Sequence, residues 1–273
     1  MSYVNLERTD LRASLSSWIT SAMSALNAAT YEGLIGYIHW PRHRCPKAYD
    51  DDEAFARCPN MFEWYFDQPC CRKRPSTAPI WPFEDSHATI TKHPIADHGA
   101  FYRRHLLFNR NVTDRFESLV ARHGLHLGDT IAVSWRGTDN VVDGRPRVPI
   151  EQYFPVIDRI LEVEPDLDVF VKAEEQGATD TLLRRYPNAI TVPEFFSARA
   201  GETQMQDWVS PAPGYERGMQ VALLILLFSR CKFLLRIKAN LSDIAAKLSS
   251  GTAVNVPAVK SYRFLRRQPS KTA

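Results

Sequence analysis

The sequence has no hydrophobic run long enough to cross a membrane. Its longest apolar run, from Val221 to Phe228, has eight residues, whereas a transmembrane helix needs about 20. Arg230 and Lys232 interrupt its continuation, so we expect a buried element of a folded domain. The first eight residues also lack the basic segment and apolar core of a secretory signal. We therefore expect a cytoplasmic protein.

Cysteine is scarce, and its spacing fits neither a disulfide framework nor a metal site. The chain has five cysteines, an odd number that suits reduced thiols in the cytoplasm. There is no Cys-x-x-Cys pair, and the spacing to neighbouring histidines is irregular, unlike that of structural zinc sites. Asp166-Leu167-Asp168 has the form of a metal-binding motif, but it follows Pro165 and precedes its strand, which is typical of a turn. We therefore expect no metal.

Neither sign of charge dominates the chain. It has 34 basic and 31 acidic residues and a formal net charge of +3. Five of the basic residues lie in the segment 260–273, which has no acid, so the rest of the chain is nearly neutral. Nucleic-acid binding requires a broader basic surface, and we expect none. The basic tail is interpreted as a solvated end, with weak contact to an anionic membrane surface as the alternative, at about 1 kcal/mol per basic residue.

The second half of the chain alternates between strands and helices. With 273 residues and 44% apolar content, the chain is long enough for two modest domains. After a strand that begins at Thr130, the patterns predict helices at 150–162, 179–185, 218–229 and 241–248, and strands at 168–171, 188–192 and 233–237. This alternation predicts a parallel sheet that is covered on both faces.

The first half is less regular. Its patterns predict a helix over 7–30, a strand over 31–40, and loops with short helices around Phe62 to Phe66 within 41–98. One or two helices follow over 103–123, with Thr113 as a possible N-cap and a glycine-bounded end at 124–128. A domain boundary is expected near this end.

The most informative stretch is Trp135-Arg136-Gly137-Thr138-Asp139, which ends the apolar run that starts at Ile131. In an open α/β sheet, ligands bind beyond the carboxyl ends of the strands. An arginine at this place suits a diphosphate, because its planar fork can hold two phosphate oxygens at once. The alternative is a structural arginine that pairs with a nearby carboxylate such as Asp139 or Asp143.

Three further blocks accompany this stretch, and together the four resemble the GDP-fucose-dependent fucosyltransferases of the NodZ and protein O-fucosyltransferase type, especially a bacterial and viral branch. The blocks occur in the family's order at 60–66, 131–139, 148–171 and 215–242. The resemblance implies an α/β, GT-B-like fold, in which two Rossmann-like domains face each other across a cleft. Residues 1–127 would form the acceptor-side domain, 128–259 the nucleotide-sugar-binding domain, and 260–273 the basic tail.

The resemblance also implies the donor-binding residues. Asn240-Leu241-Ser242 is similar to the family's diphosphate-binding turn, and Lys238 would add a positive charge beside it. Asn and Ser side chains at a helix start cap the first turn, and the backbone amides there are exposed to a phosphate. The alternative is a helix N-cap without a ligand. Glu174 and Glu175 stand where the family has two aspartates that hold the nucleoside; the alternative is a favourable helix start. Gly137 and Thr138 complete the donor site.

The implied reaction is inverting, metal-independent transfer from GDP-fucose, without a cofactor, to a glycan or glycoconjugate such as a polysaccharide. Arg136 would neutralise the departing diphosphate, and Asp139 would orient Arg136 or contact the sugar. No general base is identified; His39, His43 and Glu63 are the acceptor-side candidates, and a structural role is the alternative for each.

Several positions depart from the family pattern: Leu224 replaces an aspartate of the buried helix, Ala239 a serine of the diphosphate-binding turn, and Asn140 a lysine after the Arg-Gly-Thr-Asp segment. The ending at 247–251 differs as well. Two alternative functions follow. The donor would be another nucleotide-diphosphate sugar, or the chain would bind a nucleotide or carbohydrate without turnover.

Overall fold

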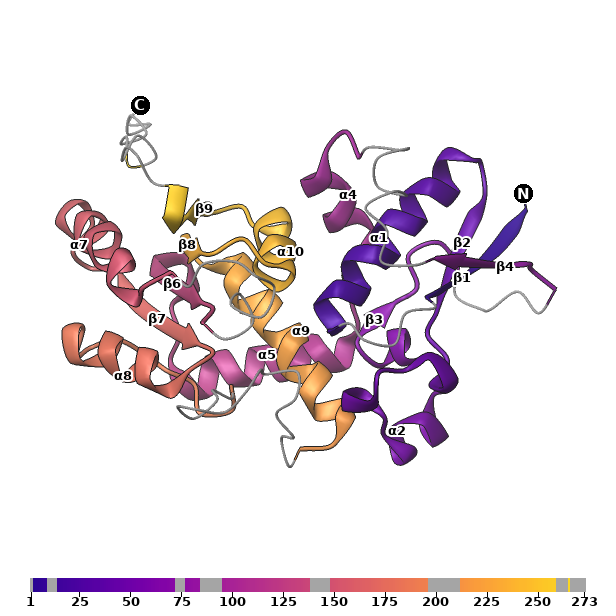
Figure 1. Ribbon diagram of the computed structural model, residues 1–273, viewed down its shortest axis with the longest axis horizontal. Coiled ribbons are helices and arrows are strands. Elements are labelled where there is room, and N and C mark those ends of the chain that lie inside the picture. The colour runs from indigo at the N-terminus through magenta and orange to yellow at the C-terminus, as the bar shows by residue number, and fades with distance from the viewer. Residues whose placement is uncertain are drawn as a thin grey trace.

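The computed structural model describes residues 2–8, 14–71, 77–83, 95–137, 148–195, 212–258 and 265. Most of its strands form two parallel sheets at opposite ends of the molecule, with long helices between them (Figure 1), and two short strands, at 66–67 and 107–108, form an antiparallel pair. The first sheet belongs to the N-terminal half and the second to the C-terminal half. The described residues contain no helix that is both long and apolar enough to span a membrane.

The first sheet has the order β2-β1-β4 and is parallel throughout. Its strands are β1 (Tyr3–Arg8), β2 (Ile35–His39) and β4 (Ile80–Phe83). Helix α1 (Leu15–Tyr31) follows β1, is capped by Ser14, and buries an apolar face that includes Trp18. The helix predicted over 7–30 was therefore wrong at its start, because Glu7 lies in β1. Asn5 and Glu7 are buried in this central strand, so polar residues disguised its pattern.

Short elements connect the first sheet to the second. They are the 3-10 helices at 42–44, 47–49 and 61–64, α2 (Asp52–Arg57), β3 (Phe66–Asp67), α4 (His98–His105), β5 (Leu107–Phe108), α5 (Arg110–His123) and a 3-10 helix at 127–129. The side chain of Asn109, and not that of Thr113, caps α5, by accepting from the amide of Val112 at 3.1 Å. Gly124 ends α5 with a φ of 58°, the left-handed conformation that favours glycine.

The second sheet has the order β7-β6-β8-β9, and all its neighbours are parallel. Its strands are β6 (Thr130–Trp135), β7 (Asp168–Ala173), β8 (Phe233–Arg236) and β9 (Thr252–Asn255). Its helices are α7 (Phe154–Val163), which a 3-10 turn at 150–153 precedes, α8 (Gln176–Arg185), α9 (Gly214–Arg230) and α10 (Asn240–Leu248). The strand predicted over 188–192 was wrong, because only Ile190 forms a bridge, to Phe170. Strand β9 was not predicted.

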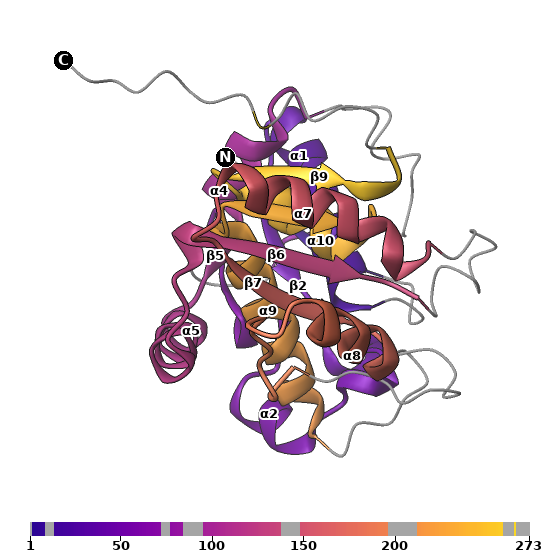
Figure 2. The ribbon, with the colours of Figure 1, turned by 90° about the vertical axis from the view of Figure 1, so that its left-hand side faces the viewer.

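Both faces of the second sheet are covered, as the alternation predicts. Ile131 and Val133 of β6 share a core cluster with α7 and α8, whereas Ala132 between them joins a second cluster with α9 and α10. Figure 2 shows α7 and α8 in front of the strands and α9 behind them. Adjacent residues of a strand point to opposite faces, so the run from Ile131 to Val133 is apolar on both faces.

Helix α9 links the two halves of the molecule. The cluster that covers one face of the second sheet also includes α1 and the aromatic residues Trp40 and Phe62. The hydroxyl of Tyr65 donates to the backbone oxygen of Tyr215 in the first turn of α9 at 2.9 Å. Gly218, one turn later, leaves room for the Tyr65 ring. The domain division at residue 127 stays a prediction.

A substitution at Gly218 tests the packing of Tyr65 against α9. A Cβ atom at Gly218 would lie 2.1 Å from the Tyr65 hydroxyl oxygen, so Gly218→Ala should lower the free energy of unfolding by about 2 kcal/mol despite the better helix propensity of alanine. Urea unfolding measures this change.

The matched control is Gly177→Ala in the first turn of α8, where an added Cβ meets nothing within 4 Å. It should be neutral or stabilising by up to about 1 kcal/mol. Equal stability of the two variants would contradict the close packing of Tyr65 on α9.

Candidate functional site

The order of the second sheet defines where a ligand is expected. The chain passes from β6 to β7 on one side, and then returns to place β8 on the other side of β6. The carboxyl ends of β6 and β8 therefore flank the topological switch point, the usual ligand site of open α/β sheets. Arg136 follows β6, and residues 237–240 follow β8.

Arg136 is held at this place by Glu174, which follows β7. The Arg136 Nε atom donates to Glu174 Oε1 at 2.8 Å, and the Gly137 amide donates to Oε2 of the same carboxylate at 3.1 Å. The side chains of Arg136 and Glu174 are 23% and 11% exposed. One carboxylate thus fixes both the guanidinium and the backbone that follows it. The structural alternative named Asp139 or Asp143 as the partner of Arg136; both lie outside the described residues, within which Glu174 pairs with Arg136.

Gly137 is required by close packing. A Cβ atom there would lie 2.2 Å from the Trp135 ring and 2.4 Å from Glu175 Oε1. The Trp135 ring is itself held by its Nε1 atom, which donates to the Val148 oxygen at 2.9 Å. Only glycine lets the chain turn beside these groups, so Gly137 shapes the segment that carries Arg136.

Two further cations lie on the same face of the sheet, and the sequence interpretation missed both. Lys172 of β7 and Arg236 of β8 are the register partners of Ser134 in β6, so they form one row across the carboxyl edge. Arg236 forms an ion pair with Asp243, and its buried Nε atom has no hydrogen-bond partner among the described residues. A buried donor of this kind favours an acceptor such as phosphate. The sequence did contain a signal for Lys172 and Arg236, because each is a cation within or at the end of an apolar strand, much as Arg136 follows one.

The turn before α10 differs from the prediction. Ala239 occupies the N-cap position without a side-chain hydrogen bond. Ser242 is buried, and its hydroxyl donates to the oxygens of Ile237 and Ala239 at 3.0 and 3.1 Å. The predicted capping by Asn240 and Ser242 was therefore wrong, because Ser242 closes the loop behind the helix start. Asn240 and Lys238 are exposed.

The remaining donor-side candidates divide into two groups. Glu175 stands at the N-cap position of α8 without a side-chain capping bond. Thr138 and Asp139 lie outside the described residues. The structure therefore brings Arg136, Gly137, Glu174 and Glu175 together.

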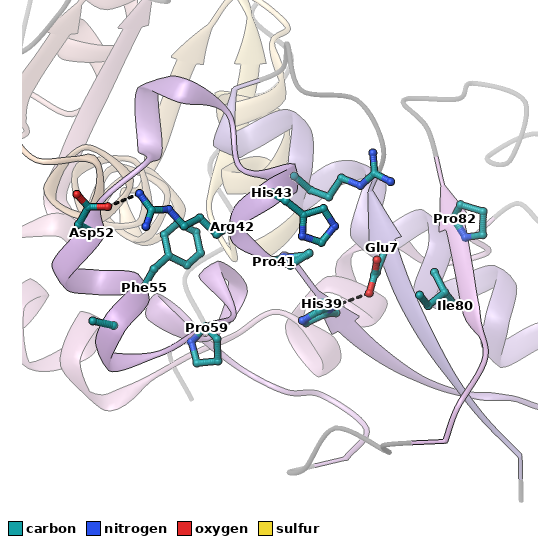
Figure 3. Close-up of a pocket in the computed structure, with 12 residues that line it drawn as sticks. Glu7, His39, Pro41, Arg42, His43, Asp52, Phe55, Pro59, Ile80 and Pro82 are labelled. Carbon is teal, nitrogen blue, oxygen red and sulfur yellow. Dashed lines mark hydrogen bonds and ion pairs between the residues drawn. The ribbon is translucent and has the colours of Figure 1, made fainter.

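The acceptor-side candidates do not form one group. His39 and His43 line a cavity of about 750 Å³ at the carboxyl ends of the first sheet, together with Glu7 (Figure 3). Glu63 does not line it; its Oε1 accepts from the Tyr37 hydroxyl at 2.6 Å and from Gln68 Nε2 at 3.0 Å. Burial and this carboxylate raise the pKa of Tyr37, and Glu63 thus stabilises the polar network beneath β2.

Comparison with solved structures supports the fold. No protein-family model and no curated protein sequence matches the chain. NodZ alpha-1,6-fucosyltransferase soaked with GDP-fucose matches with a TM-score of 0.57 and 14% identity, over 91% of this chain and 93% of that one. Fucosyltransferase NodZ from Bradyrhizobium matches with a TM-score of 0.52 and 14% identity, over 91% of this chain and 94% of that one. A mutant of Arabidopsis thaliana FUT1 in complex with GDP matches with a TM-score of 0.56 and 10% identity, over 92% of this chain and 69% of that one. The predicted α/β, GT-B-like fold is thus confirmed.

Lys172 gives the row of cations a testable pH dependence. Burial lowers the pKa of Lys172 from 10.5 to about 8, and the nearby Glu174 opposes this shift. Between these two pH values the unfolded chain holds more protons than the folded one, so the stability contributed at this site rises with pH. The variant Lys172→Met has no titrating group at this position, so this contribution to the pH dependence of stability is lost. The variant should be more stable than the wild type at pH 7, by on the order of 2 kcal/mol, and the difference should decrease steadily as the pH rises from 8 to 10.

Urea unfolding of both proteins from pH 7 to 10 measures the difference, and other titrating groups cancel between them. A difference that stays constant over this range would show that Lys172 is fully charged in the folded protein.

Proposed function

We propose that the protein is a glycosyltransferase that uses GDP-fucose as its donor and a glycan or glycoconjugate as its acceptor. The observation that carries the proposal is the Arg136–Glu174 pair at the switch point of a sheet whose fold matches that of NodZ and FUT1. Those proteins are fucosyltransferases whose structures were obtained with GDP-fucose or GDP. The same site supports recognition of a nucleoside diphosphate in this chain.

The diphosphate would be held mainly by cations. Arg136 would hold the diphosphate through its guanidinium group, which Glu174 orients at Nε, and Arg236 and Lys172 add charge on the same face. Gly137, Thr138, Lys238, Asn240 and Ser242 belong to the segments that follow β6 and β8. Glu174 and Glu175 would accept hydrogen bonds from the nucleoside, beside those that Glu174 accepts from Arg136 and Gly137.

The chemistry we propose is a single displacement with inversion, without a metal. An acceptor hydroxyl oxygen forms a bond to the anomeric carbon, while the bond from that carbon to the β-phosphate oxygen breaks. Its electron pair stays on the departing GDP, where Arg136 stabilises the added charge, an effect of about 3 kcal/mol for a well-placed donor. Asp139 would orient Arg136 or contact the sugar.

Three further features stay predictions. The first is the alternative function, with another donor sugar or with binding but no catalysis; the departures that motivate it are Leu224, which is buried in α9, and Ala239, which gives no side-chain cap. The second is the cytoplasmic location. The weak membrane contact of residues 260–273 is the third; of this tail only Leu265 is described, and it packs against the second sheet's core.

Arg136 provides the test. GDP at a concentration about 100 times its dissociation constant should stabilise the wild type by about 2.7 kcal/mol, measured as a rise in unfolding temperature. Arg136→Lys keeps the positive charge beside Glu174 but loses the fork, and it should bind GDP about 10- to 100-fold more weakly.

The matched control is Arg159→Lys, an exposed arginine on α7 whose partner is Glu162; it should bind GDP as the wild type does. Release of GDP from GDP-fucose then separates the functions. Stabilisation without release favours a binding protein, and stabilisation by other nucleotide sugars but not GDP-fucose favours another donor. If no nucleoside diphosphate stabilises the wild type, the proposed function is wrong.

A further inference from the structure

The cavity of the first sheet has the composition of a sugar site. Figure 3 shows Phe55 and Pro59 on one side and Ile80 and Pro82 on the other, with His39 and Glu7 between them. The volume of about 750 Å³ lies within the range of small-molecule sites, which combine apolar walls with a few polar groups. Its place, beyond the carboxyl ends of β1 and β2, corresponds to that of Arg136 in the second sheet.

The charges that line the cavity are balanced. The acids are Glu7 and Asp52, and the bases are Arg42 and Arg44, with His43 on the same surface. Arg42 forms ion pairs with Asp50 and Asp52, so its charge is neutralised within the protein. Arg44 also lines the cavity, and its buried Nε atom has no hydrogen-bond partner among the described residues, so it can donate to a ligand oxygen. Because the acids and the arginines of the lining are equal in number, a neutral, hydroxyl-rich ligand suits it.

A buried histidine–carboxylate pair lies in this lining. His39 Nδ1 and Glu7 Oε1 are 2.6 Å apart, and both side chains are 8% exposed. With the carboxylate accepting from Nδ1–H, the lone pair of the ring lies on Nε2, which is then the atom that can take up a proton. The carboxylate also stabilises the imidazolium that results. The described residues contain no group of three or more acids, histidines or cysteines that could hold a metal ion, so this pair is not part of such a group there.

We propose that this cavity binds an uncharged saccharide acceptor and that His39, oriented by Glu7, is the general base of the transfer reaction. The proposal rests on the proposed function, because the attacked carbon belongs to the donor sugar. As the acceptor oxygen bonds to the anomeric carbon, its proton passes to His39 Nε2, and the electron pair of the broken bond leaves with GDP. His39 is a catalytic residue in this assignment, and Glu7 is a positioning residue.

The test compares His39→Gln with the wild type in the full chain. Two quantities are measured: stabilisation by GDP, and release of GDP from GDP-fucose between pH 5 and 8. Release is measured in water alone and with the methyl glycosides of glucose, galactose and N-acetylglucosamine. His39→Gln should bind GDP within twofold of the wild type but release it about 100-fold more slowly. The wild-type rate should fall toward acid pH, as a base that must be neutral requires, and the variant should lose this acid limb.

Glu7→Gln separates positioning from structure and carries the test if His39→Gln does not fold. It should slow release with little change in KM and move the acid limb to lower pH, because the imidazolium loses its stabilising carboxylate. The controls are His126→Gln and Glu117→Gln, both exposed and outside the cavity; they should behave as the wild type.

The outcomes distinguish the two proposals. If GDP does not stabilise the wild type, both fail. If GDP binds but the wild type releases none from GDP-fucose under any condition, the base assignment fails and the donor site stands. If His39→Gln, or Glu7→Gln in its place, retains a rate within threefold of the wild type and the same pH profile, the base assignment is wrong while the transferase proposal stands.

Discussion

The carboxylate of Glu174 organises the carboxyl edge of the second sheet. A single side chain at the end of β7 accepts from the Arg136 guanidinium and from the Gly137 amide at the end of β6, so two adjacent strands are joined beyond their ladder. Burying either charge alone would be costly, whereas the pair keeps Arg136 charged and oriented with little exposure. The close contacts around Gly137 fix the same segment from the side of Trp135. The proposed donor site depends on this arrangement.

The second sheet could be predicted from the sequence more fully than the first, for a physical reason. Strands β6, β7 and β8 are covered on both faces and are nearly continuous apolar runs, so the strands could be predicted, although the cations Lys172 and Arg236 within them were overlooked. Strand β1 is also central and buried, but it carries Asn5 and Glu7 in its interior. Their partners come together only in the folded chain: Glu7 pairs with His39, and the side-chain amide of Asn5 donates to the backbone oxygen of Ala78.

The site shows the same division. Arg136 and Gly137 could be predicted because they end an apolar strand, and Glu174 because it follows the next one. The pairing of Arg136 with Glu174 could not, since it depends on which strands are neighbours. The role of Ser242 was misjudged because a serine near a helix start is ordinarily a cap, whereas here it donates backward to two carbonyl oxygens. Glu7 could not be connected with His39 before β1 was known to be a strand in register with β2.

The account is tested most directly by a crystal structure of the protein with GDP. It predicts the diphosphate at the carboxyl ends of β6 and β8, with phosphate oxygens about 2.7 to 2.9 Å from the Arg136 guanidinium and Glu174 still bound to its Nε atom. A nucleotide bound elsewhere, with Arg136 making no contact to it, would contradict the central claim.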